Sequence, residues 1–167
     1  RIGPPFSMFL PFWRPCLARP DPATPGAAPQ LLRGPAVWPA SCELESLALL
    51  PRHNWAPGLH AAWTPGSAAA RAHLRQFLSD SLDSYPTDRD RPDLAGTSRL
   101  SPYLHFGEIG PRQVWHETRR FAQAHGRHTA LRQSQFLTDL GWRAFAHTPS
   151  VHSPPPHRGS SRPNRRW

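Results

Sequence analysis

Apolar residues recur at helical spacing in three stretches of the sequence, and this pattern constrains the fold more than any other feature. The stretches cover residues 65–85, 111–125 and 129–146, and no alternation typical of a β-strand competes with them. The repeating positions are Leu74, Phe77, Leu78, Leu82, Tyr85, Val114, Trp115, Phe121, Leu131, Phe136, Leu137, Leu140 and Phe145. Each stretch presents one apolar stripe that must pack against another element. The sequence therefore predicts an all-α ordered region.

Helix boundaries are marked by residues that favour helix ends. Thr64 is the expected N-cap of the first helix, with Pro65 as its first residue, and Pro86 is expected to end it. A short helix is expected between Ser101 as N-cap and Phe106, followed by a glycine that closes it. The third and fourth helices are expected to begin after Gly110-Pro111 and near residue 129.

The start of the short helix carries chemistry as well as a boundary. Thr97, Ser98 and Ser101 supply hydroxyls around Arg99. Free backbone N–H groups at a helix start, beside hydroxyls and a guanidinium, can hold an anion such as a phosphate. Such runs are also common as simple helix caps. By themselves these residues leave both interpretations open.

Outside the helical stretches the composition does not favour a packed core. The chain has 22 prolines and 11 glycines, and only 38% of its residues are hydrophobic. Residues 17–62 are rich in Pro and Ala and predict an extended connector, whereas residues 147–167 contain five prolines, four arginines and no acid. We expect this last segment to be a disordered tail, and its composition also fits a shifted reading frame of a GC-rich gene.

Charge and cysteine content narrow the function classes. The net charge is +9 and every basic residue is arginine, which favours polyanionic partners but also follows from GC-rich coding. Two cysteines and ten scattered histidines show no metal-ligand spacing, so no metal site is predicted. The sequence has no apolar run long enough to span a bilayer. We therefore expect a soluble, cytoplasmic protein with no membrane partner.

Several segments, in the same order, resemble the photolyase/cryptochrome family, in a class I-like form. Residues 97–115 resemble its flavin-binding signature, and residues 63–66 resemble the opening of its helical FAD-binding domain. Residues 136–145 resemble a helix that lines the flavin and substrate pockets, and residues 9–13 resemble the end of its N-terminal α/β antenna domain. The resemblance therefore divides the chain into an antenna remnant (1–16), an interdomain connector (17–62), a partial helical FAD-binding domain (63–146) and the tail.

The resemblance implies roles for individual positions. The residues expected to bind FAD are Tyr85, Thr97, Ser98, Arg99, Leu100, Ser101, Phe136 and Arg143. Asp139 and Trp142 match residues that face the DNA lesion, and because they are three apart they would share one helix face. An indole can stack on a flipped-out pyrimidine dimer, and a carboxyl can bond its edge. No catalytic residue is assigned, since the cofactor carries the electron-transfer chemistry.

The resemblance also implies limits. Asp139 stands where the family usually has Glu, Ala144 stands where an acid is usual, and the match ends after residue 145. The implied function is light-driven repair of cyclobutane pyrimidine dimers by electron transfer from reduced FAD, with an incomplete pocket and no antenna chromophore domain. Two alternatives stay open: a remnant that binds nucleic acid weakly through arginines without FAD, and a cryptochrome-like blue-light sensor.

Overall fold

The computed structural model describes residues 6–126 and 134–152, and these residues form helices without any strand. The elements in chain order are α1 (Phe9–Ala18), η1 (Leu44–Leu47), α2 (Pro57–Ala62), α3 (Ser67–Asp80), α4 (Tyr85–Asp88), α5 (Ser101–His105), α6 (Pro111–Ala124) and α7 (Gln135–His152). The all-α prediction is confirmed over the described part of the chain. The apolar stripes explain it, because each packs against a neighbouring helix.

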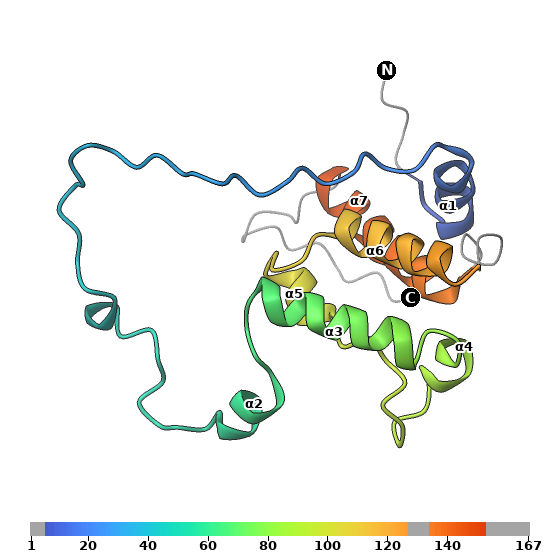
Figure 1. Cartoon of the computed structure of the whole chain (residues 1–167). Helices are drawn as coiled ribbons and strands as arrows, with labels where there is room; N and C mark the ends of the chain where they lie inside the picture. The colour runs from blue at the N-terminus through green and yellow to red at the C-terminus, as the bar shows by residue number, and fades with distance from the viewer. Residues whose placement is uncertain (1–5, 127–133, 153–167) are drawn as a thin grey trace, which may run out of the picture.

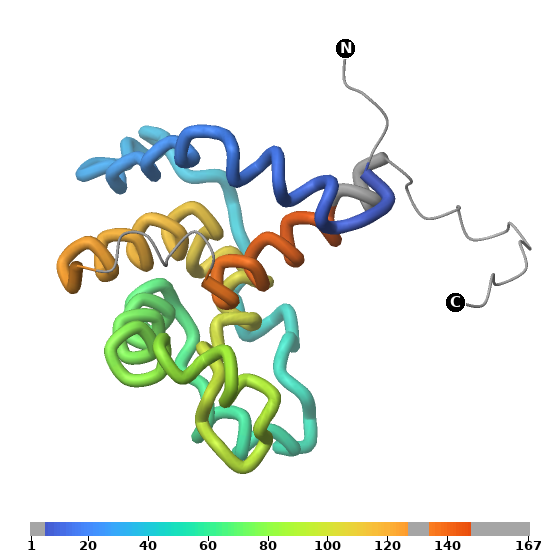
Figure 2. Tube along the Cα trace, turned by 90° about the vertical axis from the view of Figure 1, so that its right-hand side faces the viewer, coloured from blue at the N-terminus to red at the C-terminus, as the bar shows by residue number. Residues whose placement is uncertain are grey.

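The core lies between α3, α5, α6 and α7. In Figure 1, α3 and α6 run beside one another, and Figure 2 shows α1 next to α7 at the other side of the bundle. The buried apolar side chains are Ala70, Leu74, Phe77, Leu78, Tyr85, Leu100, Tyr103, Ile109, Val114, Ala122, Phe136 and Leu137. Most of the apolar positions expected from the sequence are in this core or packed against it, whereas Leu131 lies outside the described residues.

The connector between α1 and α3 contributes little burial. It leaves the bundle after α1, runs far from the other helices and returns through α2 (Figure 1). Leu32, Trp38 and Leu50 are more than 70% exposed along it. Its two ends are held: His116 on α6 bonds the Pro22 carbonyl at 2.8 Å and Arg119 pairs with Asp21, and at the other end Arg99 bonds the Ala62 carbonyl. The extended chain expected over this segment is what the structure describes, interrupted by η1 and α2.

The helix boundaries differ from the expected ones at several points. The first helix begins at Ser67 because Gly66 has a φ of 109°, outside helical geometry, so Thr64 is not its cap. It ends at Asp80, since Ser81 has a φ of −132°, and Tyr85 belongs to the separate short helix α4. Tyr85 thereby occupies a turn that can pack against α7.

Helix α5 begins one residue earlier than expected. Leu100 is its N-cap and Ser101 is already helical, and no side-chain cap hydrogen bond forms. The expected glycine stop is confirmed, because Gly107 follows the helix with a left-handed φ of 72°. Gly126 likewise follows α6 with a φ of 70°.

Helix α7 is displaced toward the C-terminus relative to the expected 129–146. Ser134 is not helical and the helix begins at Gln135, while residues 127–133 lie outside the described residues. It continues to His152, so the disordered tail does not begin at His147 as expected. Packing of Phe145 against Phe12 of α1 supports its later turns, and extending an existing helix needs no new nucleation. The rest of the tail, 153–167, lies outside the description.

Candidate functional site

An aromatic cluster joins α3, α4 and α7 at the edge of the core. Tyr85 meets Phe77 edge-on at 5.4 Å and Phe136 edge-on at 5.6 Å, measured between ring centroids. Phe77 and Phe136 are themselves 4.7 Å apart. Edge-to-face pairs of this kind add about 0.5–1.5 kcal/mol beyond area burial. The cluster fixes the Tyr85 and Phe136 rings, two of the predicted cofactor contacts, side by side.

The Asp139 carboxylate accepts hydrogen bonds from three side chains. Tyr85 donates its hydroxyl at 2.7 Å, Gln135 donates its amide N–H at 3.0 Å, and the Arg89 guanidinium forms an ion pair with it. Burial raises the pKa of Tyr85, and its hydrogen bond to Asp139 raises that pKa further. The neutral phenol therefore remains the donor across the physiological range.

Arg89 directly follows α4 as its C-cap residue, and the loop that continues from it folds back tightly on Asp88. A Cβ on Gly96 would lie 2.5 Å from the carbonyl oxygen of Asp88, so only glycine fits there. The bond to Asp139 raises the pKa of Arg89. Sequence reasoning missed Arg89, although its place in the charged loop of residues 86–96 was the signal that could have found it.

A cavity of about 380 Å³ lies between this cluster and α5. Its walls are Tyr85, Ser98, Leu100, Ser101, Leu104, His105, Val114, Phe136, Asp139, Leu140, Arg143 and His147. The structure thus brings together seven of the ten predicted site residues. Arg143 is held in the wall by its 2.9 Å hydrogen bond to the Leu104 carbonyl at the end of α5.

Two histidines of this wall were not expected from the sequence. His105 belongs to the short helix α5 and His147 to α7, and both are exposed. His105 lies within residues 97–115, which resemble the flavin-binding signature, so this motif could have indicated it as a site residue. His147 carried no such signal, because the sequence placed it at the start of a tail. Both add an imidazole to the cavity wall that also contains Arg143.

Arg99 does not line this cavity. Its guanidinium lies over the Trp63 ring at 4.3 Å and donates to the Ala62 carbonyl at 3.3 Å. Arg99 has a left-handed φ of 52°, which costs a residue with a side chain about 1–3 kcal/mol unless surrounding contacts offset it. The contacts with Trp63 and Ala62 offset that cost. Thr97 is exposed and also lies outside the cavity wall.

Trp142 does not share a surface with Asp139, contrary to the expectation from their spacing. Its ring stacks on Phe9 of α1 at 3.9 Å and 11°, and Phe145 meets it edge-on at 5.8 Å. Residues three apart on a helix are offset by about 60°, so each can contact a different neighbour. Asp139 contacts α4, whereas Trp142 contacts α1 and remains 49% exposed.

The described residues contain no group of three or more His, Cys, Asp or Glu that could hold a metal ion. Within the same part of the chain, no helix is long and apolar enough to cross a membrane. The wall of the cavity includes aromatic rings, hydroxyls and basic side chains. These are the groups that contact a planar ring system bearing an anion.

The chain is similar to curated photolyases and cryptochromes. It is 37% identical over 156 residues to a deoxyribodipyrimidine photo-lyase of Agrobacterium fabrum, which covers 92% of this chain and 32% of that protein. It is 36% identical over 170 residues to cryptochrome-1 of Arabidopsis thaliana, covering 93% of this chain and 24% of the relative. No protein-family model matches the chain. The chain therefore spans about a third or less of these relatives' length.

The fold is similar to a solved structure as well. A bacterial class III photolyase from Agrobacterium tumefaciens matches with a TM-score of 0.80 and 35% identity. The match covers 90% of this chain and 31% of that one. The resemblance was expected to be to class I, whereas this structure belongs to class III. The helical arrangement described above is therefore that of one part of a much larger fold.

Proposed function

Because the chain belongs to the photolyase/cryptochrome family, we propose that α3 to α7 form part of a flavin-binding pocket for light-driven repair of pyrimidine dimers in DNA. The single observation that carries the proposal is the cavity in which Tyr85, Phe136, Ser98, Ser101 and Arg143 converge. Its volume lies near the lower end of the range for ligand pockets. One part of a dinucleotide cofactor is what such a cavity can hold.

The residues present fit FAD in kind. Ser98 and Ser101 offer hydroxyls for the pyrophosphate, and Arg143 places a positive charge in the same cavity wall. Tyr85 and Phe136 offer aromatic edges to a planar ring. When bound, FAD supplies light-driven one-electron chemistry. The chain's own part is to bind the cofactor, orient it and exclude water from the Tyr85 side.

Asp139 has a structural part in this pocket. Its carboxylate is already bonded by Tyr85, Arg89 and Gln135. A carboxylate with three donors holds the α4 turn against α7 and keeps the Tyr85 ring at the cavity wall. We propose this positioning role in place of direct contact with a lesion.

A second candidate function is supported by the position of Trp142. Because Trp142 lies against Phe9 and away from the cavity, the chain does not present Asp139 and Trp142 together to a flipped base. A cryptochrome-like light sensor, which would bind flavin without repairing DNA, fits that arrangement. The similarity to cryptochrome-1 of Arabidopsis thaliana, at almost the same identity as to the photolyase, supports this candidate too.

Flavin binding is tested by titrating the purified chain with FAD and following flavin fluorescence and visible absorbance. The test compares Arg143→Gln, which removes a cavity charge, with Arg52→Gln, which removes an exposed connector charge. We expect saturable binding that weakens about tenfold or more in the first variant alone, as for loss of one charged hydrogen bond. Absence of saturable binding, or equal loss in both variants, would contradict the flavin proposal.

Repair is tested separately on an oligonucleotide containing one thymine dimer. The flavin-loaded chain, chemically reduced, is illuminated with blue light and the dimer is quantified. Loss of the dimer under illumination and not in darkness would support the photolyase proposal. Bound flavin with an unchanged dimer would favour the sensor candidate. If the affinity for damaged and undamaged DNA is equal and falls steeply with salt, DNA binding comes from nonspecific attraction between arginines and phosphates.

A further inference from the structure

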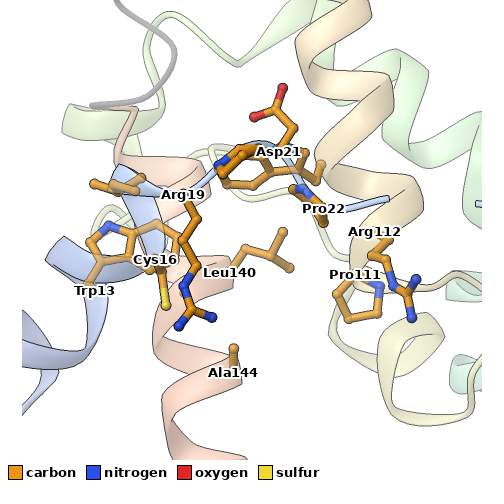
Figure 3. A pocket seen from close by; sticks show the side chains of 13 residues that line it. Trp13, Cys16, Arg19, Asp21, Pro22, Pro111, Arg112, Leu140 and Ala144 are labelled. Carbon is orange, nitrogen blue, oxygen red and sulfur yellow. The ribbon is translucent and has the colours of Figure 1, made fainter. Parts of the chain in front are cut away.

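A second cavity, of about 310 Å³, lies beside α7 next to Trp13 and Trp115, and Figure 3 shows the side chains that line it. It is bounded by the end of α1 and the segment that follows, by the start of α6 and by the middle of α7. The two cavities share only Leu140 among their lining residues. This cavity is therefore separate from the pocket assigned above.

Its walls are mainly apolar and aromatic. Trp13 and Leu140 both line it in Figure 3, with Ala144 below Leu140 and Pro111 on the α6 side. Trp13 and Trp115 meet edge-on at 6.4 Å and 81°. A flat apolar group is the shape that such walls bury well.

One buried donor in the wall lacks a protein acceptor. The indole nitrogen of Trp115 is buried without a hydrogen-bond partner in the part of the chain that the structure describes. Leaving such a donor unbonded is unfavourable, and indole N–H groups usually find a partner when buried. A ligand oxygen in this cavity would supply the missing acceptor.

Two guanidinium groups give the cavity a positive rim. Arg19 and Arg112 both line it, from α1's end and from α6 (Figure 3), and neither forms an ion pair within the described residues. Asp21, the acid among the lining residues, is paired with Arg119 on α6. The net charge around the cavity is therefore positive, and guanidinium groups match carboxylates in a two-pronged geometry.

We propose that this cavity binds a small amphiphilic anion, in chemical class an aromatic carboxylate. The ring lies on the apolar wall of Trp13, Leu140 and Pro111, and the carboxylate lies toward Arg19 and Arg112. The Trp115 indole N–H donates to an oxygen of the same ligand. The site is separate from the candidate flavin cavity, because the two have only Leu140 in common among their lining residues.

The proposal is tested with 2-naphthoate as probe and its neutral amide, 2-naphthamide, as the matched ligand. Binding to the full chain is followed in ¹H–¹⁵N spectra of the tryptophan indole groups, with Trp115→Phe identifying the Trp115 resonance. We expect 2-naphthoate to shift that resonance and to bind about tenfold tighter than the amide, as expected for two charge-assisted contacts.

Two variants and a control locate the site. Arg19→Gln with Arg112→Gln removes the rim charge, and Ala144→Leu fills the cavity from an exposed helix position. Both changes should lower the affinity of the chain for 2-naphthoate. Arg52→Gln, on the exposed connector, should leave that affinity unchanged. Helix content by circular dichroism establishes that each variant is folded.

Several results would overturn the proposal. Equal affinity for the acid and the amide would leave an apolar cavity without anion selectivity. An unshifted Trp115 resonance, or binding unchanged by Ala144→Leu, would place the probe elsewhere on the chain. No binding by the folded wild-type chain would remove the site altogether.

Discussion

Replacing Gly141 with alanine tests the contact that holds α1 against α7. A Cβ at position 141 would lie 2.6 Å from a ring carbon of Trp13 and within 2.8 Å of two more. Favourable carbon contacts lie near 3.5–4.0 Å, so α1 or the indole would have to move by roughly 1 Å. Trp13 cannot turn away freely, because it stacks on Phe9 and meets Trp115 edge-on.

Two opposing terms set the magnitude. Alanine is favoured over glycine inside a helix by about 0.8–1 kcal/mol. Overpacking at a filled contact costs about 1–3 kcal/mol, and a displaced α1 also loses the 3.9 Å stack of Phe9 on Trp142. With the lost stack included, at about 0.5–1.5 kcal/mol, the net effect should weaken the docking of α1 by about 0.5–3.5 kcal/mol. One helix would loosen while α3 and α6 keep their packing.

Amide hydrogen exchange followed by mass spectrometry measures this effect. Exchange in α1 should become about tenfold faster in Gly141→Ala, whereas exchange in α3 should not change. Gly58→Ala is the matched control, because it lies in helix α2 and an added Cβ there meets open space. That variant should slow exchange in α2 alone, by the helix-propensity term.

The reasoning is refuted if Gly141→Ala protects α1 or leaves its exchange unchanged. Either outcome would mean that Trp13 does not pack on Gly141. The stacking of Phe9 on Trp142 and the cavity beside Trp13 would then lose their support as well. A general acceleration across α3 and α6 would contradict the local nature of the contact.

Three further predictions concern the core and the Asp139 cluster. Leu74→Ala, at a 1% exposed core position, should lower the free energy of unfolding in urea by about 2–5 kcal/mol, whereas Leu50→Ala on the connector should change it by less than about 0.5 kcal/mol. Asp139→Asn should cost about 1–3 kcal/mol in the same assay by breaking the Arg89 pair, and adding Arg89→Gln should cost little more, since the two act together. Because the pKa of Tyr85 is raised in the folded state, its contribution to stability is present below about pH 10 and should be lost as the pH rises further. Tyr85→Phe should make the melting temperature depend less on pH above about pH 10. An unchanged pH dependence in that variant would contradict the raised pKa.

The candidate site was predictable where local sequence carried the signal. Ser98, Leu100 and Ser101 precede or open α5, and Phe136 and Arg143 lie on α7, so their motifs placed them on neighbouring elements. All five line the candidate flavin cavity. Their roles toward FAD stay predictions.

Other site residues depended on contacts that spacing cannot specify. Arg99 was expected beside its serine neighbours, but its left-handed backbone turns it to Trp63. Asp139 and Trp142 were expected together because they are three apart. Arg89 pairs with Asp139, whereas Phe9 stacks on Trp142, so the two side chains contact different neighbours. Each partner lies far away in sequence.

The sequence by itself determined the helical class, the location of the apolar stripes, the exposed connector and the glycine stop after α5. These features follow from interactions between residues a few positions apart, and such interactions are present in the sequence pattern. Only the tertiary structure decided that Asp139 anchors α4 through Arg89 and Tyr85. It also decided that α1 covers one face of Trp142, and that a second cavity opens beside Trp115. Those outcomes depend on which helix faces meet, and long-range packing settles that choice after the helices are specified.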